Sequence, residues 1–491
     1  MELQKHASSR PRTAKTEGKE RGVAEFVNRA ALKYVGFALL LAWHYALWFV
    51  PHVFAQTELL DERVTTAWLV NLGATVVSLL LIALFLGRKR HLSTYRPLYV
   101  AAPALTCAAT LALCLAPQVF AVPILAYALA FFLGATESVM WILWGERYAC
   151  VKANFSLRHI GTTFGFTLLA TVVVAWSLPT YASTTFVSLL PIASGTLLAV
   201  ARRDGARAFP VLLPKSASQG GLKSMTTVSV ITFLASAACY FLVAIIPWQA
   251  LPTRDLSFTL GVLGGGAIML GIAGISIASK DKANIFKMLP WMIVLLIAAF
   301  ALFLADESAF LPSFVMATGI SSLLEMLLIM YFGILTSKGY VTPAAAFAFS
   351  GAFVRAGIAI GNTWAVGYEH APSLADLVTP ETCLALMCAL AALLVPLVRQ
   401  EFNIVALTAA PPSKAEIDEI CAEVASEFSL STREREILEL IARGYTTNNM
   451  AQKLVISPYT VNTHIRHIYE KMQIHKRSEL LNYLNMQRSD F

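Results

Sequence analysis

Long apolar runs recur through the first 400 positions of this 491-residue chain. The hydrocarbon core of a bilayer is about 30 Å thick, and a helix needs roughly 20 apolar residues to cross it. Twelve runs of about that length can be counted, at 31–54, 65–87, 97–116, 119–145, 160–178, 182–201, 226–248, 257–279, 288–305, 309–336, 343–367 and 382–398. They predict an all-α fold whose main part is a polytopic bundle of about twelve transmembrane helices.

The charged residues divide the chain into two parts. Residues 1–400 hold 46 charged side chains, whereas the last 91 residues hold 22. The chain as a whole is 14% charged and 57% hydrophobic, against about 25% charged and 45–50% apolar residues in soluble proteins. These values exclude a single soluble enzyme, a secreted disulfide scaffold and a disordered polypeptide. They predict a membrane body followed by a small water-soluble domain.

Four segments follow from this division. A polar, basic leader at 1–30 is expected to be disordered, and it is too long for the basic start of a signal peptide, so the first apolar run is expected to remain as an anchor. The membrane domain is expected at 31–398. A linker with a short amphipathic helix is expected at 399–428, its apolar stripe either packing on the next domain or forming a dimer. The soluble domain is expected at 429–491.

Lys and Arg are distributed unequally between the two sides of the predicted bundle. If the first run starts in the cytoplasm, the segments on the opposite side carry only Arg63 and Arg254. Cytoplasmic loops of membrane proteins carry an excess of these residues. The asymmetry predicts a multi-pass protein of the bacterial inner membrane, with both the N-terminus and the C-terminus in the cytoplasm.

The longest loop before the tail, at 202–225, divides the runs six and six. Glu137 in the fourth run and Glu325 in the tenth each precede a glycine by eight residues, as in a duplicated half. Over 31–398 this plan resembles the major facilitator type of transporter, which implies two halves around a central cavity. The chain has LGRKRH after the second run, where that family carries a Gly- and Asp/Arg-rich signature, a departure that argues against working transport.

Ionisable and amide side chains inside the apolar runs are candidates for function, because they are costly in lipid unless they face a cavity or a partner. Two interpretations stay open. Glu325 and Arg355, on consecutive helices, could pair to neutralise each other while the remaining polar residues hydrogen-bond between helices. Alternatively, these side chains could line a pocket for a small molecule. The candidate pocket residues are His44, Asn71, Glu137, Glu325, Arg355 and Asn362.

Motifs for catalysis, metal binding and cofactors are missing from the sequence. The seven cysteines show neither CxxC spacing nor clustering with histidines at metal-ligand intervals, so we predict no disulfide, metal site or cofactor. We find no P-loop, nucleophile elbow, HExxH motif or dinucleotide-binding glycine pattern. The chain is therefore expected not to be an enzyme, and no catalytic residues are proposed.

The soluble tail shows the pattern of a helix-turn-helix. Ser431 and Glu434 fit a capping box that opens a helix ending near Gly444. A second short helix follows, and Ser457 with Pro458 then fits the N-cap and first position of a third. A short helix, a tight turn and a second helix are the elements that many DNA-binding domains share.

The third helix separates into two faces. Apolar residues recur at Val461, Ile465, Ile468 and Met472 and are expected to face inward. Asn462, Thr463 and Arg466 point away and offer the donors and acceptors that base edges in a major groove require. Phosphate contacts are predicted for Ser457, Thr460, His464, Lys471, Lys476 and Arg477. Taken singly, each of these residues also fits a solvated helix face.

Residues 430–484 closely resemble the LuxR type of DNA-binding domain, also called GerE type. The matching marks are Thr432-x-Glu434-x-x-Ile437-Leu438, the turn at Gly444, Met450-Ala451 with Leu454, Ile456-Ser457, Thr460-Val461-x-x-His464, Ile468-Tyr469-x-Lys471-Met472 and Arg477. The resemblance implies a small four-helix domain in which Asn462, Thr463 and Arg466 contact bases. Asn462 stands where the family usually has Lys. The resemblance also implies an internal ion pair between Glu434 and Arg477.

Residues 429–491 hold nine Lys and Arg and six Asp and Glu, a net charge of only +3, so we expect a homodimer on paired half-sites of double-stranded DNA. The other expected partners are the lipid bilayer, a small-molecule ligand and RNA polymerase. The sequence thus predicts a membrane-bound one-component transcription regulator that binds DNA and senses a small molecule through its membrane domain. A major-facilitator-like transporter with a regulatory DNA-binding tail is the alternative, and a passive tether released by proteolysis is a third interpretation.

Overall fold

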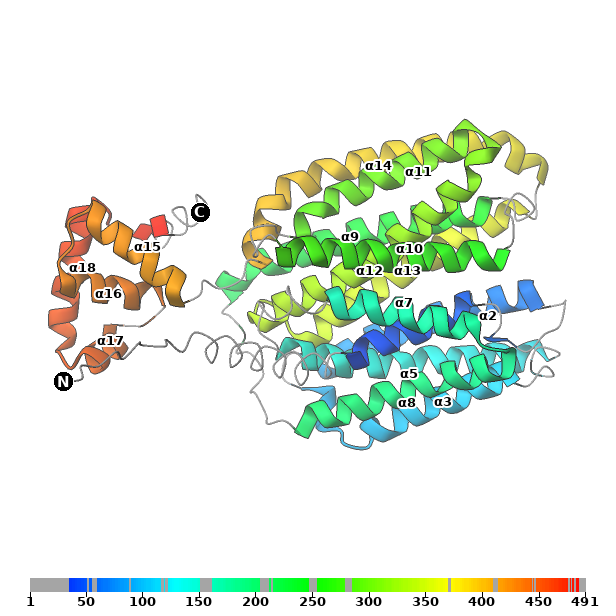
Figure 1. Ribbon diagram of the computed structural model, residues 1–491, viewed down its shortest axis with the longest axis horizontal. Coiled ribbons are helices and arrows are strands. Elements are labelled where there is room, and N and C mark those ends of the chain that lie inside the picture. The colour runs from blue at the N-terminus through cyan, green and yellow to red at the C-terminus, as the bar shows by residue number, and fades with distance from the viewer. Residues whose placement is uncertain are drawn as a thin grey trace, which may run out of the picture. The chain divides into compact units, whose positions relative to one another are not determined.

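Every regular element that the structure describes is a helix (Figure 1). The structure is a computed structural model that describes residues 35–50, 53–54, 60–87, 90–115, 119, 122–150, 161–203, 212, 215–246, 254–278, 285–369, 372–408, 414–443, 445, 447–475, 477, 479–480 and 483–484. The leader predicted at 1–30 lies outside these residues. Contacts divide the chain into two compact units, Met1–Ala409 and Ala410–Phe491. Each unit is described by itself.

Apolar helices make up the first unit. The first is Val35–Phe49. It is followed by α2 (Leu60–Leu86), α3 (Leu98–Leu115), α5 (Pro123–Ala149), α7 (Gly161–Ser177), α8 (Thr180–Arg203), α9 (Lys215–Ile245), α10 (Arg254–Ala278), α11 (Leu289–Ala305), α12 (Phe310–Ser337), α13 (Pro343–Glu369) and α14 (Pro372–Thr408). Within the described residues, nine helices are long and apolar enough to cross a membrane, and the apolar parts Val35–Phe49, Gly161–Ser177 and Thr259–Ile275 are shorter. The prediction of many apolar helices is confirmed, and the count of twelve crossings stays a prediction.

Helix α14 runs beyond the apolar segment that the sequence defines. The run was predicted to end at 398, but the helix continues to Thr408. Ile404 in this extension is buried, and the Lys338 ammonium donates a hydrogen bond to the carbonyl oxygen of Leu407 at 2.6 Å. These contacts give the extra turns a packed face, which favours continuation of the helix where the apolar run stops.

Close helix packing positions α13 in the interior of the first unit. Helix α13 contacts α9, α2 and α5, and α7 contacts α10. Gly357 and Gly361 lie one turn apart on α13, and a Cβ atom at Gly361 would stand 2.0 Å from the carbonyl oxygen of Ala237 on α9. Small residues at such spacing let two helix backbones approach closely. The same helix carries Arg355, whose side chain is buried.

The second unit is built from α15 (Lys414–Glu427), α16 (Thr432–Ala442), α17 (Thr447–Leu454) and α18 (Pro458–Met472). One apolar core joins them, containing Cys421, Val424, Ile437, Leu438, Ile441, Met450, Val461, Ile468, Met472, Leu480 and Leu484. Because Cys421 and Val424 of α15 belong to this core, the amphipathic helix packs on its own domain, as the first of our two interpretations proposed.

Two serine caps fix the starts of α16 and α18. The Ser431 hydroxyl accepts a hydrogen bond from the Glu434 amide, and the Glu434 carboxylate accepts one from the Ser431 amide, which completes the predicted capping box. Ser457 caps α18, and Pro458 occupies its first turn. Helix α18 ends at Met472, and the next residue, Gln473, caps it with a φ of 54°, in the left-handed region. Gly444, predicted to end the first of these helices, lies outside the described residues.

Candidate nucleic-acid interface and buried ion cluster

The two faces of α18 are arranged as its periodicity predicts. Val461 and Ile468 are fully buried, Met472 is buried, and Ile465 is half-buried against the same core. Asn462 and Arg466 are exposed on the other side, whereas Thr463 is half-buried. An amide and a guanidinium therefore project from one face of a helix that follows a turn, which is the arrangement used to read base edges in a major groove.

The N-terminal turn of α18 is suited to a phosphate. The Thr460 amide donates to the Ser457 hydroxyl at 3.0 Å, and the two hydroxyl groups lie 2.8 Å apart. Ser457 and Tyr459 are exposed beside this turn. A helix N-terminus carries unpaired amides and partial positive charge, so it attracts anions. The positions of Ser457 and Thr460 fit the predicted phosphate contacts.

Arg466 remains available to a ligand. Its Nε atom lies 3.6 Å from Oε1 of Glu470, but the two side chains are 70% and 65% exposed. An exposed ion pair of this kind contributes about 0–1 kcal/mol. Arg466 can therefore exchange Glu470 for a base or a phosphate at little cost.

Lys471 and Arg477 each bond to partners inside the second unit. The Lys471 ammonium donates to Glu434 Oε2 at 2.7 Å and to the Ser429 carbonyl oxygen at 3.0 Å. The Arg477 guanidinium donates to the carbonyl oxygens of Tyr445 at 2.7 Å and Ile441 at 3.5 Å. Both side chains bond within the domain. Among the described residues Glu434 pairs with Lys471, so the predicted Glu434–Arg477 ion pair is wrong, whereas the phosphate contacts predicted for Lys471 and Arg477 stay predictions. Lys476 lies outside the described residues.

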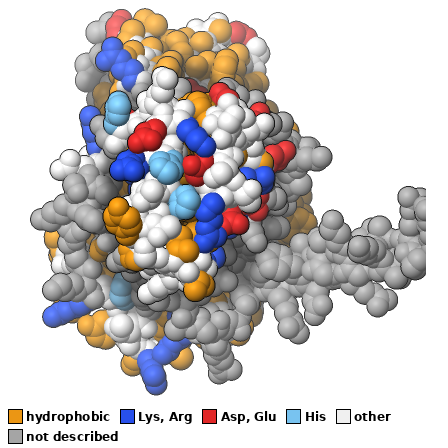
Figure 2. All heavy atoms as spheres, turned by 90° about the vertical axis from the view of Figure 1, so that its left-hand side faces the viewer, with side chains coloured by type: hydrophobic (Ala, Val, Ile, Leu, Met, Phe, Trp, Pro, Cys, Tyr) orange, Lys and Arg blue, Asp and Glu red, His pale blue; other side chains and the backbone are white. Residues whose placement is uncertain are grey.

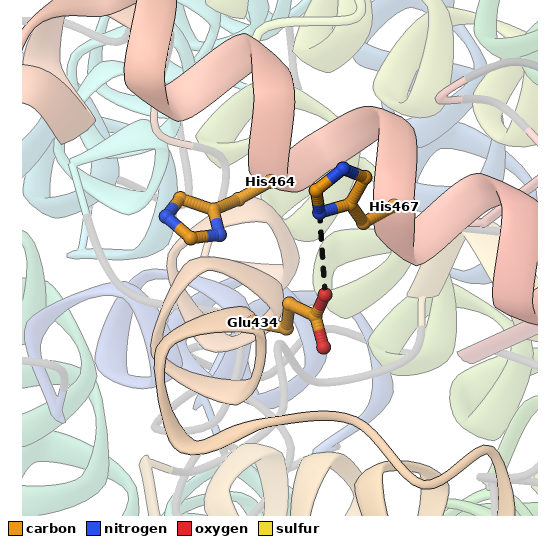
Figure 3. A group of neighbouring side chains, drawn as sticks. All are labelled: Glu434, His464 and His467. Carbon is orange, nitrogen blue, oxygen red and sulfur yellow. Dashed lines mark ion pairs between the residues drawn. The ribbon is translucent and has the colours of Figure 1, made fainter.

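The Glu434 carboxylate is the centre of a small polar network. Burial raises the pKa of this carboxyl, but the hydrogen bonds from Lys471 and from the backbone of Ser431 outweigh the burial and hold the pKa at about 2. The His467 Nδ1 atom lies 3.7 Å from Glu434 Oε1, as the dashed line in Figure 3 marks. His464 lies on the same side of α18 (Figure 3). The sequence pattern predicted a phosphate contact for His464 and gave no role to His467.

Figure 2 shows the surface of the second unit, where basic, acidic and uncharged polar side chains alternate and histidines lie near the middle. No broad, uniformly basic patch is visible on the described part of this face. A mixed surface agrees with the small net charge of the tail. Phosphate attraction alone should then be modest, and base contacts should carry a larger share of specific binding.

Replacing Ser457 by Ala is expected to destabilise the second unit by about 1 kcal/mol, because the Thr460 amide loses its acceptor. Chemical unfolding followed by circular dichroism would measure the change. Ser457→Asp keeps an acceptor and should lie close to the wild type. Equal losses in both variants would contradict a capping role for Ser457.

A buried ion cluster lies within the first unit. Arg355 on α13 donates from Nη2 to Oε1 of Glu137 on α5 at 2.7 Å and from Nη1 to Oε1 of Glu325 on α12 at 3.0 Å. His44 Nδ1, on the first helix, lies 3.3 Å from Glu137. All four side chains are buried. The predicted pairing of Glu325 with Arg355 is confirmed, and Glu137 and His44 join it.

Two aromatic residues of this cluster were missed in the sequence. The Tyr45 hydroxyl donates to Glu325 Oε2 at 3.0 Å. The Arg355 guanidinium lies 4.5 Å from the centre of the Trp141 ring, close enough for a cation–π interaction. Tyr45 is the residue after the candidate His44, and Trp141 lies one helical turn after Glu137. Their positions next to these two candidates could have identified them in the sequence.

The remaining candidate pocket residues lie apart from the cluster. The Asn71 amide donates to the carbonyl oxygen of Ala130 at 3.4 Å, and no hydrogen bond among the described residues joins Asn71 or Asn362 to the four side chains of the cluster. A cavity of about 640 Å³ lies elsewhere in this unit, and none of the six candidates lines it. Its polar lining residues include Lys223, Ser224, Tyr340, Arg399 and Gln400.

Glu146 is a further buried carboxylate that the sequence analysis did not identify. Its two oxygens accept hydrogen bonds from the amides of Leu92 and Ser93 at 2.7 and 2.8 Å. These amides belong to the turn that follows α2, directly after the sequence LGRKRH at 86–91. Glu146 therefore fixes the connection between α2 and α3 to the end of α5, which is a structural role.

Comparison with known families identifies the second unit. Residues 428–484 match the model of the family described as bacterial regulatory proteins, luxR family. This confirms the resemblance found at 430–484, and the chain carries a LuxR-type helix-turn-helix DNA-binding domain.

The oxygen regulatory protein NreC of Staphylococcus epidermidis is 38% identical over 71 residues, which are 14% of this chain and 33% of that protein. NreC of Staphylococcus carnosus is 46% identical over 54 residues, 11% of this chain and 25% of that protein. The chain thus spans about a third or less of the length of these relatives.

Two solved structures are similar to the chain over a longer stretch. The human organic anion transporter MFSD10 (TETRAN) covers 74% of this chain and 96% of its own, with 16% identity and a TM-score of 0.46. A variant of the Escherichia coli fucose:proton symporter FucP covers 76% of this chain and 98% of its own, with 12% identity and a TM-score of 0.47.

Proposed function

We propose that the chain is a membrane-bound one-component transcription regulator. In this proposal, twelve helices cross the bacterial inner membrane, six up to α8 and six from α9 onward, and both ends lie in the cytoplasm. Helix α9 begins at Lys215, so the loop between the halves is shorter than the segment 202–225 that the sequence suggested. The C-terminal domain binds double-stranded DNA as a homodimer and acts on RNA polymerase. The observation that carries the proposal is a capped recognition helix, with Asn462 and Arg466 exposed, in the same chain as a large apolar helical body.

The membrane body acts as the sensor in this proposal. Arg355 joins α13 to carboxylates on α5 and α12, so its contacts differ between any two arrangements that separate these helices. A small molecule that binds one arrangement better shifts the equilibrium by the difference in its two affinities. About 1–3 kcal/mol of such coupling would change DNA binding several-fold or more.

Crosslinking the chain to DNA in the native cells, followed by sequencing of the recovered DNA, tests the proposal. We expect a small set of enriched sites that share paired half-sites, and loss of these sites in the variant with both Asn462→Ala and Arg466→Ala. The enriched genes would then suggest the inducing compound. Recovery of the same DNA with the double variant, or digestion of the tail by protease added outside intact cells, would exclude the proposal.

A transporter with a regulatory tail is the second candidate. The buried cluster of Glu137, Arg355 and Glu325 favours it, because ionisable groups inside a helical bundle often mark a path for ions or substrates. Vesicles reconstituted with the purified chain separate the two candidates. Saturable solute accumulation that disappears with Glu137→Gln would support transport, whereas DNA binding without accumulation would support the regulator.

A further inference from the structure

Three potential metal ligands converge at the junction of α16 and α18. Glu434, His464 and His467 each offer one ligand atom, and these atoms lie within 4.8 Å of one another. Figure 3 shows the two imidazole rings projecting from the same side of α18 toward the carboxylate on the first turn of α16. The ring centroids of the two histidines are 6.4 Å apart. Residues three apart on a helix are neighbours on its surface, so the sequence spacing itself brings the two rings together.

The Glu434 carboxylate is held in one orientation by the surrounding structure. Its Oε2 atom accepts hydrogen bonds from the Lys471 ammonium and the Ser431 amide, each at 2.7 Å. Its Oε1 atom is the one directed at His467. One oxygen is thus fixed by hydrogen bonds and the other faces the imidazoles. Outer hydrogen bonds of this kind orient the ligands of metal sites and increase their affinity.

We propose that Glu434, His464 and His467 form a binding site for a divalent transition metal ion of the Zn²⁺ class, with water at the fourth position. Two imidazole nitrogens and one carboxylate oxygen are a donor set that suits Zn²⁺ at bond lengths of about 2.0–2.2 Å. Tetrahedral geometry at those lengths puts ligand atoms about 3.4 Å apart. The ligand atoms here lie within 4.8 Å of one another. In this proposal, rotation of the two half-exposed imidazoles brings them to the shorter distance that the metal requires.

The sequence alone did not predict this site. The cysteines have no metal-ligand spacing, and His464-x-x-His467 by itself is a weak signal. The third ligand stands 30 residues before His464, on another helix. Only the packing of α16 against α18 brings it to the pair. Lys471 also stays bonded to the carboxylate oxygen that the metal does not use, so the ion pair and the metal site are compatible.

Metal binding can be measured on the full-length chain, purified in detergent without a histidine tag and stripped with a chelator. We expect one equivalent of Zn²⁺ to compete with a chromophoric chelator, and Co²⁺ to give the intense visible absorption of a tetrahedral site. His464→Ala and His467→Ala should each weaken binding at least tenfold. His475→Ala removes an exposed histidine of the same domain outside the cluster, so it should bind as the wild type does.

A second measurement guards against loss of folding in the variants. Zn²⁺ should raise the unfolding temperature of the wild-type domain, because a ligand that binds only the folded state stabilises it. Circular dichroism should show unchanged helix content in both histidine variants, with the rise in unfolding temperature abolished. Equal Zn²⁺ affinity in the wild type and both variants, or no stoichiometric binding, would overturn the proposal. Neither result depends on DNA, so failure of this site is distinguishable from failure of the proposed function.

Discussion

Arg355→Met is expected to lower the free energy of unfolding of the membrane unit by about 3–5 kcal/mol, the cost of breaking a buried ion pair by removing one partner. The substitution leaves the carboxylates of Glu137 and Glu325 buried without the guanidinium that lies 2.7 and 3.0 Å from them. It also removes the cation above the Trp141 ring. Unfolding of the purified chain in mixed micelles, followed by tryptophan fluorescence, would measure the loss.

Two controls separate the charge effect from a general effect of the substitution. The triple variant Glu137→Gln, Glu325→Gln and Arg355→Met removes all three charges, so it should regain most of the stability that the single variant loses. Arg399→Met changes an exposed arginine of the same unit and should lie within about 0.5 kcal/mol of the wild type. Similar losses for Arg355→Met and Arg399→Met would contradict the structural importance of the cluster.

Arg466→Ala is expected to weaken binding to the target DNA by about 1–3 kcal/mol and to relax discrimination at one base position. The side chain is exposed on the outer face of α18, with only a weak exposed contact to Glu470. Its loss should therefore leave the folded domain almost unchanged. Titration of target duplexes that differ at single positions would show which base pair loses its preference.

Lys471→Met provides the contrasting variant. This lysine holds Glu434 and the Ser429 carbonyl oxygen within the domain, so its loss should destabilise the domain by about 1–3 kcal/mol. The preference among duplexes should stay the same once the protein is folded. A change in base preference with Lys471→Met, or a uniform loss on all duplexes with Arg466→Ala, would reverse the roles assigned to these two side chains.

Local sequence patterns predicted the elements of this fold well. Apolar runs long enough for a bilayer located the helices of the first unit, because burial of a helix in lipid requires continuous apolar sequence. In the second unit, the Ser431–Glu434 box and the Ser457–Pro458 start gave two helix ends, because capping depends on residues three positions apart. The helical periodicity of apolar residues separated the buried Val461 and Ile468 from the exposed Asn462 and Arg466.

Partners that come from distant parts of the chain could not be predicted in the same way. Glu137 and Arg355 are 218 residues apart, and only the packing of α5 with α13 brings them together. Lys471 and Arg477 have long side chains that reach several acceptors, so their roles depend on which acceptor the tertiary structure brings near. For Lys471 this acceptor is Glu434, 37 residues earlier. The family resemblance suggested the wrong partner for that carboxylate.

The buried cluster contains two acids and one permanent base, with His44 beside them, and this imbalance limits how the bundle can move. If α5 separates from α12 and α13, Arg355 can follow only one of the two carboxylates. The carboxylate that loses its ion pair with Arg355 then needs another cation, which can be a proton, a metal ion or the amine of a bound solute. Under the proposed function, the acidity and salt content of the cell's surroundings would therefore bear on which genes are transcribed.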